Sequence, residues 1–266
     1  MVKKQIFLPG LLLLALIFTS CDSFFSDSWG QMRDYDPSKI DLNAGNLDSW
    51  IESSIGNPKL AAALAEKIKA TVKNSADSKE RAKFQEAGVT LAVEASGIGA
   101  SILSNAGAAL GDIEDLQEEA VMDILKKIQD DFKSGGPQAA ASLAEIVSVP
   151  GTLTGNTQGG TPEFEGNYAG TAKAGDVGQA VLVLALAVFG ETGDVEAEID
   201  KLTESGNPAV AGLQIDSVSG RIKIADADPA PEAVALAAYL NLIAEDNTGR
   251  FADNPITDAL KKAFSL

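Results

Sequence analysis

The sequence predicts a mainly α-helical protein, built either as a multi-helix bundle or as an array of helix pairs. Apolar residues recur at helical spacing through most of the chain after residue 46. Asn or Asp side chains able to cap a helix precede several of these segments. Aromatic residues make up only 6% of the sequence, so the core must rely on Ala, Leu, Ile and Val, which suit closely packed helices.

Residues 46–149 are expected to form a first helical half. The Asn57-Pro58 pair places a capping side chain before a residue suited to the first turn of a helix. Asp77 should cap the next helix, which is expected to extend to about residue 111. Glycine weakens a helix, so a break is possible near Gly97.

The clearest amphipathic helix is predicted over residues 112–132. One face is apolar and the opposite face is mostly charged. The apolar stripe consists of Ile113, Leu116, Ala120, Ile124, Ile128 and Phe132. Two glycines should end this helix, and Pro137 should start a shorter one to about Val149.

Residues 150–175 differ in composition from the segments around them. They hold many glycines and threonines and have little periodicity, which indicates either a linker between two halves or a functional flap. We favour a long surface loop that need not divide domains. A second helical half is expected over residues 176–266, with a buried helix at 181–189 and one small β-hairpin near 213–225. The Asn-Pro pairs that begin at positions 57, 207 and 254 are interpreted as recurring helix caps.

Composition excludes several classes of function. The formal net charge is −17, which disfavours nucleic acid as a partner because such binding needs cationic side chains. The chain has no histidine, and therefore no Ser-His or Cys-His catalytic pair and no imidazole metal ligand. A single cysteine excludes an internal disulfide.

The first 21 residues have the layout of a signal peptide. Lys3 and Lys4 precede an apolar run over residues 6–18, and small residues then lead to Cys21. The sequence Phe18-Thr19-Ser20-Cys21 resembles the lipobox of bacterial lipoproteins, although Phe18 stands where that motif usually has Leu. The resemblance covers only this segment of the chain.

The resemblance to bacterial lipoproteins implies lipidation and a location. Residues 1–20 would be removed, and Cys21 would carry a thioether-linked diacylglycerol that holds the protein to a membrane of the bacterial cell envelope. Residues 21–45 are then expected to be a flexible, lipidated tether. The sequence does not choose between the inner and outer membranes or between their faces.

The remaining residues contain no complete catalytic or cofactor-binding motif. The Gly-rich segment 155–161 lacks the lysine of a phosphate-binding loop. Oxygen-rich turns at 226–228 and 245–253 do not match an EF-hand. No cofactor or metal is therefore expected. Glu94 is the one charged residue between positions 87 and 111, which makes it a candidate buried acid with a raised pKa.

Three functions remain open on the sequence alone. The favoured one is a non-enzymatic, membrane-anchored module that binds other envelope proteins through its helical faces. The alternative is a protein that binds lipid or another hydrophobic ligand, or partly inserts in the bilayer, because the segments 87–110 and 177–190 are strongly apolar. An enzyme that uses paired carboxylates is the third.

Overall fold

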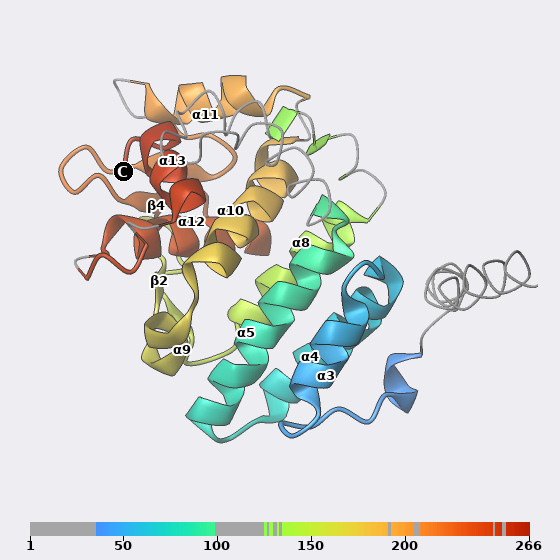
Figure 1. Cartoon of the computed structure of the whole chain (residues 1–266). Helices are drawn as coiled ribbons and strands as arrows, with labels where there is room; N and C mark the ends of the chain where they lie inside the picture. The colour runs from blue at the N-terminus through green and yellow to red at the C-terminus, as the bar shows by residue number, and fades with distance from the viewer. Residues whose placement is uncertain are drawn as a thin grey trace, which may run out of the picture. The chain divides into compact units, whose positions relative to one another are not determined.

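The computed structural model describes residues 36–98, 125–126, 128–129, 132, 135–190, 193–204, 208–246, 248–251 and 254–266. Contacts divide the chain into two units, Met1–Tyr35 and Asp36–Leu266. The signal segment, Cys21 and most of the expected tether lie outside the described residues. The second unit is mainly α-helical, which confirms the predicted fold class (Figure 1).

The prediction of a flexible tether over residues 21–45 places the start of the folded part too late in the chain. The compact unit already begins at Asp36, before residue 45. Ile40 is buried, and the indole N–H of Trp50 donates a hydrogen bond of 3.2 Å to the backbone oxygen of Asp41. A short 3-10 helix, η1, lies at Pro37–Lys39 and contacts the helix α4 (Pro58–Asn74). These contacts fix a segment whose polar composition alone suggested a flexible chain.

The first group of helices consists of α3, α4, α5 and α8. Their bounds are Leu47–Ser54 for α3, Pro58–Asn74 for α4, Ser78–Ala95 for α5 and Gly136–Val147 for α8. Helices α4, α5 and α8 pack against one another. The three helices approach closely at Gly88 of α5, where an added Cβ would lie 2.8 Å from a methyl carbon of Ile68 and 3.0 Å from one of Ile146. The missing side chain thus lets two helices pack against the third.

The second group surrounds the apolar helix α10. Its members are α10 at Ala174–Phe189, α11 at Val195–Thr203, α12 at Pro231–Ala244 and α13 at Pro255–Ala263. Val181 to Leu186 are all buried, as the sequence predicted for a helix that is apolar on every face.

The two groups join into a closed bundle. Helix α10 packs against α5 and α8 of the first group as well as against α12, and α8 also packs against α12. In an array of helix pairs each pair would contact only its neighbours along the chain. The contacts therefore select the bundle from the two architectures that the sequence left open.

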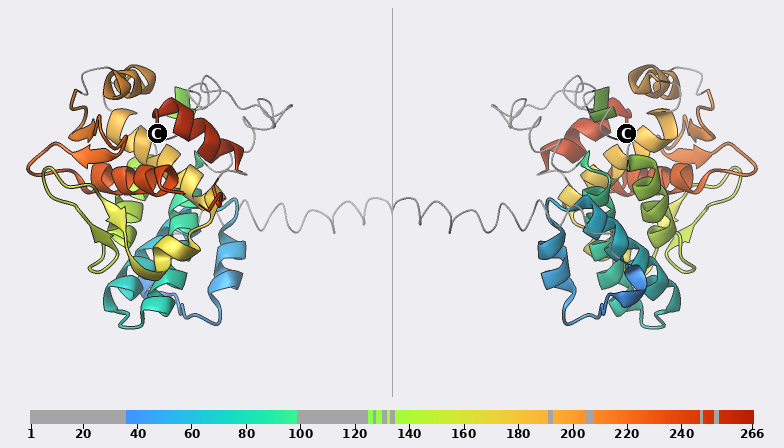
Figure 2. Two further views of the ribbon diagram at one scale, coloured as in Figure 1. Left: turned by 90° about the vertical axis from the view of Figure 1, so that its left-hand side faces the viewer. Right: turned by 90° about the vertical axis from the view of Figure 1, so that its right-hand side faces the viewer.

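Two small antiparallel sheets lie against α12 (Figure 2). Strands β3 (Leu213–Ile215) and β4 (Ile222–Ile224) form the hairpin predicted near 213–225, with Gln214 opposite Lys223. Strands β1 (Leu153–Thr154) and β2 (Glu163–Phe164) form a second pair that the sequence did not predict.

The Gly/Thr-rich segment 150–175 belongs to the folded unit and is not a linker. It contains β1, β2 and the short helix α9 (Gly166–Thr171), which packs on α5. The turn between β1 and β2 also pairs with β4, because the Gly159 N–H donates to the Ile224 oxygen at 2.7 Å and the Ile224 N–H donates to the Gly160 oxygen at 2.9 Å. Pairing of this kind uses only backbone atoms, so it requires no hydrophobic periodicity that could be seen in the sequence.

Helix ends test the capping predictions. Asn57, Asp77 and Asn254 each accept hydrogen bonds from backbone amides of the helix that follows. Asn207 lies outside the described residues, but the prediction that it caps a helix is wrong, because residues 208–212 have no helical backbone. Helix α5 ends at Ala95, and Gly97 has a φ of +73°, so the helix does break where the glycines allowed it.

Only the end of the amphipathic helix predicted at 112–132 lies within the described residues. Leu125, Lys126, Ile128, Gln129 and Phe132 have helical backbone. Leu125, Ile128 and Phe132 are buried, as the apolar stripe requires for the last two. Residues 99–124 lie outside the described part of the chain.

Candidate binding cavities and buried polar groups

Of the two site residues chosen from the sequence, only Glu94 lies within the described residues. Cys21 lies outside the described residues. Glu94 lies on α5, is only half-buried, and accepts a hydrogen bond of 2.7 Å from the backbone N–H of Gly56. The prediction that Glu94 is a buried acid is therefore wrong. Its carboxylate holds the turn between α3 and α4, so the lack of nearby charges in the sequence reflected a structural role.

The carboxylate of Asp176 is half-buried where two helices pack together. Asp176 lies in the first turn of α10, which packs against α5. Burial raises the pKa of Asp176, and the negative charge of Glu86 on α5 raises it further, while Lys173 and a hydrogen bond with Thr90 oppose the shift. One signal in the sequence pointed to this residue: an acid placed just before a long apolar run.

A buried tyrosine pair lies near Asp176. The hydroxyl groups of Tyr168 on α9 and Tyr239 on α12 are 2.5 Å apart, and Phe164 packs edge-on against both rings. Burial raises the pKa of both phenols, and the Asp176 charge adds to that effect. Both hydroxyls therefore stay protonated at neutral pH, and the pair ties α9 to α12.

Replacing Asp176 with Asn should stabilise the protein at neutral pH. A carboxyl whose folded pKa is raised contributes stability below its unfolded pKa, and that contribution is lost as the pH rises through the folded pKa. Urea unfolding at pH 7 should therefore show a higher midpoint for Asp176→Asn than for the wild-type chain, and the difference should vanish near pH 3. The matched control is Asp48→Asn, which changes an exposed acid in the first turn of α3 and should not raise the midpoint.

The acidic turn after α12 has its carboxylate already engaged. Burial alone would raise the pKa of Asp246, but hydrogen bonds from the Phe251 amide and from both the amide and the hydroxyl of Thr248 lower that pKa to about 2. These bonds close the turn that places Phe251 in the core. Within the described ranges, no three His, Cys, Asp or Glu side chains gather as a metal site would need.

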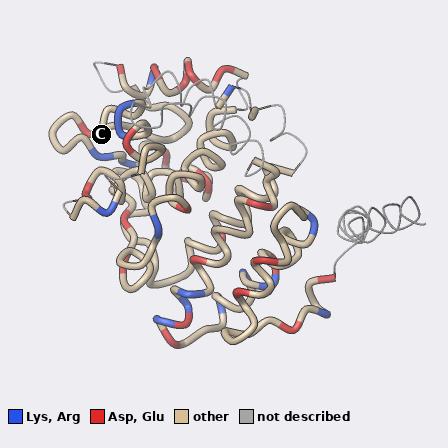
Figure 3. Tube along the Cα trace, viewed as in Figure 1, with Lys and Arg blue, Asp and Glu red and all other residues tan. Residues whose placement is uncertain are grey.

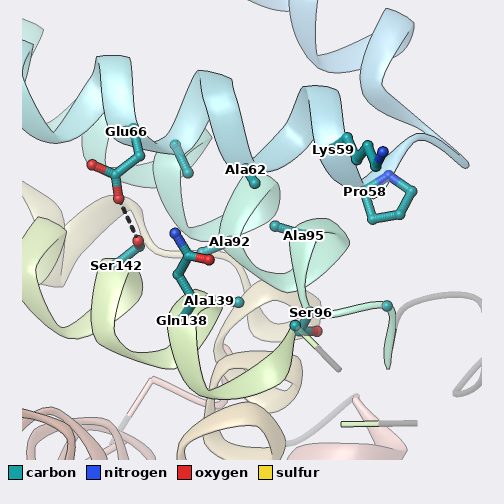
Figure 4. A pocket seen from close by; sticks show the side chains of 13 residues that line it. Pro58, Lys59, Ala62, Glu66, Ala92, Ala95, Ser96, Gln138, Ala139 and Ser142 are labelled. Atoms are coloured by element: carbon teal, nitrogen blue, oxygen red, sulfur yellow. Dashed lines mark hydrogen bonds between the residues drawn. The ribbon is translucent and has the colours of Figure 1, made fainter. Parts of the chain in front are cut away.

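One cavity lies among α4, α5 and α8 and has a volume of about 320 Å³ (Figure 4). Alanine methyl groups from all three helices form much of its wall. At one end, Glu66 Oε1 accepts hydrogen bonds from Ser142 at 2.9 Å and from Lys69 at 2.8 Å. Burial opposes the protonation of Lys69, yet Glu66 and Glu145 together raise its pKa. The charged end of this cavity is thus satisfied by the protein itself.

The second cavity lies among α8, α10 and α12 and has a volume of about 520 Å³. Its wall is mostly apolar, with Phe132, Leu186 and Val188 among the larger side chains. Glu232, in the first turn of α12, is the charged residue in the lining. Both cavities have sizes usual for sites that hold small molecules.

Sequence reasoning did not find either cavity. Each is lined by residues of three helices, some of them far apart along the chain, and each helix shows only an ordinary apolar face in the sequence. The strongly apolar segment 177–190 was a partial signal for the second cavity, because Leu186 and Val188 belong to it.

Within the part of the chain that the structure describes, no helix combines the length and the apolar character needed to cross a membrane. Comparisons of the chain with protein families, with curated proteins and with solved structures give no match.

Proposed function

We propose that this chain is a non-enzymatic, lipid-anchored binding module of the bacterial cell envelope. The lipobox-like segment ending at Cys21 supports the anchor, and the compact unit that starts at Asp36 supports a folded module joined to it by a short connection. The observation that carries the binding role is a pair of ligand-sized cavities between packed helices, one among α4, α5 and α8 and one among α8, α10 and α12.

The favoured partners are other proteins of the envelope. A bundle of helices offers rigid grooves into which apolar side chains of a partner can insert. The alanine-lined cavity suits this role because small side chains leave room between α4 and α8, while Gln138 provides a polar group at its edge.

A hydrophobic ligand is the second candidate, and the cavity among α8, α10 and α12 favours it. That cavity is the larger of these two and has the more bulky apolar side chains in its wall. Flotation of the unlipidated chain on phosphatidylcholine vesicles tests whether the ligand is bilayer lipid. A chain that floats favours the lipid ligand, and a chain that stays in solution leaves the protein partner as the better proposal.

Replacing Cys21 with Ala should abolish lipid labelling and release the protein from the membrane. Each buried acyl methylene contributes roughly 0.8 kcal/mol to membrane binding, so loss of the acyl chains should move the protein almost wholly from the detergent phase to the aqueous phase in Triton X-114 partitioning. Ser26→Ala is the control and should label and partition as the wild-type chain does. Unchanged partitioning of Cys21→Ala would defeat the anchoring proposal.

Site-directed crosslinking tests the binding role in cells. A photoreactive residue at Gln138, on the edge of the alanine-lined cavity, should give a defined crosslinked product. The same residue at the exposed position Glu52 on α3 should not give that product. The product should also disappear when Cys21→Ala is added. Identical products from both positions would mean that the cavity plays no part in partner recognition.

A further inference from the structure

The cavity among α8, α10 and α12 has an apolar wall suited to an aliphatic body. Leu186, Ala187 and Val188 come from the end of α10, and Ala233 comes from the start of α12. Phe132 adds an aromatic side chain. Transfer of a hydrocarbon chain from water to such a wall is favourable in proportion to the area covered.

One charged group lies in this apolar wall, and no counter-ion for it occurs among the described residues. Glu232 is half-buried, and no hydrogen bond or ion pair joins its carboxylate to any residue within the described part of the chain. A carboxylate against apolar surface is partly deprived of water, and a cation placed beside it would restore the lost interaction.

The carboxylate in the alanine-lined cavity is differently placed. There the carboxylate of Glu66 is already bound by Lys69 and Ser142. Glu232 has no such partners among the described residues, so of these two cavities it is the one among α8, α10 and α12 that combines an apolar wall with an unpaired carboxylate.

The charge of the whole protein acts in the same direction. The chain has 38 acidic and 21 basic residues, and acidic side chains occur on all of the longer helices (Figure 3). A strongly negative protein attracts cations and repels anions during encounter. Anionic amphiphiles such as fatty acids are therefore disfavoured at this cavity.

We infer that the cavity among α8, α10 and α12 binds a small amphiphilic cation, in which an ammonium group pairs with Glu232 and an aliphatic body covers the apolar wall. The inference rests on the proposed binding function and gives that function a ligand class. It does not depend on the anchor or on the protein partner.

Three probes of equal length test the inference: hexylammonium, hexanol and hexanoate. Binding is measured by isothermal titration calorimetry on the full chain in phosphatidylcholine nanodiscs, and the heats from empty nanodiscs are subtracted. Hexylammonium should bind at least tenfold more tightly than hexanol, and hexanoate should bind more weakly than either. Equal binding of the three probes, or no binding of hexylammonium, would overturn the inference.

Variants assign the binding to this cavity. Glu232→Gln should remove the preference for hexylammonium over hexanol. Glu52→Gln removes an equal charge from an exposed position on α3 and should keep the preference. Ala187→Phe places a ring into the cavity from a half-exposed position and should abolish binding of both probes. Circular dichroism and the thermal midpoint check that each variant is folded. A preference that survives Glu232→Gln would contradict the assignment, whereas the proposed anchoring and crosslinking results would stand unchanged.

Discussion

Replacing Asn241 with Ala should lower the free energy of unfolding by about 3 kcal/mol, because several buried backbone groups would lose their partners together. Asn241 on α12 is fully buried. Its side chain accepts from the Ile222 N–H at 2.8 Å and donates to the Ile222 oxygen at 3.0 Å and to the Pro162 oxygen at 2.9 Å. One amide group thus attaches both small sheets to the central helices.

Urea unfolding followed by circular dichroism measures this effect. Asn74→Ala is the matched control, since Asn74 is an exposed helical residue whose side chain donates one hydrogen bond to the Ala70 oxygen. That change should cost no more than about 0.5 kcal/mol. Similar losses for the two variants would show that the buried amide of Asn241 does not hold the sheets to α12.

Replacing Gly155 with Ala should also destabilise the protein by about 3 kcal/mol or more, since a side chain there meets backbone that cannot move aside cheaply. An added Cβ at Gly155 would lie 1.9 Å from the backbone oxygen of Thr161, and the residue has a φ of +65°. The expected consequence is opening of the turn that joins β1 to β2 and pairs with β4.

Gly159 provides the control within the same turn. Its φ is +76°, but an added Cβ would meet no atom within 4 Å. Gly159→Ala should therefore cost about 1 kcal/mol, which is the strain of a left-handed backbone alone. The difference between the two unfolding free energies isolates the cost of the steric clash. Equal losses would mean that the turn relaxes to accept a side chain at Gly155.

Features that depend on neighbouring residues could be predicted from the sequence. Asn57, Asp77 and Asn254 cap the helices that follow them because each side chain reaches amides only two or three residues away. The β3–β4 hairpin was predictable for the same reason, since its strands are close in the chain. The mainly helical fold follows from apolar spacing over single segments.

The Asn207-Pro208 pair shows where a local capping pattern fails to predict a helix. A turn forms at Ala211-Gly212, and Val210 and Leu213 exchange backbone hydrogen bonds of 2.8 and 2.9 Å across it. The two-residue connection Ala211-Gly212 has positive φ at both positions, which suits a tight hairpin and not a helix. Competing turn chemistry a few residues downstream thus decided the conformation.

The tertiary structure decided which polar groups are buried and where cavities lie in the unit Asp36–Leu266. Burial of Asn241, the half-burial of Asp176 and the contact of Glu94 with Gly56 all depend on which helices meet, and the sequence does not encode that meeting locally. The cavities among α4, α5 and α8 and among α8, α10 and α12 have the same origin, because each is lined in part by segments separated by tens of residues. By itself, the sequence determined helix positions, the hairpin and a lipobox-like signal, since these follow from short-range spacing. Only the packing of distant helices decided which carboxylates are buried and where ligand-sized space remains.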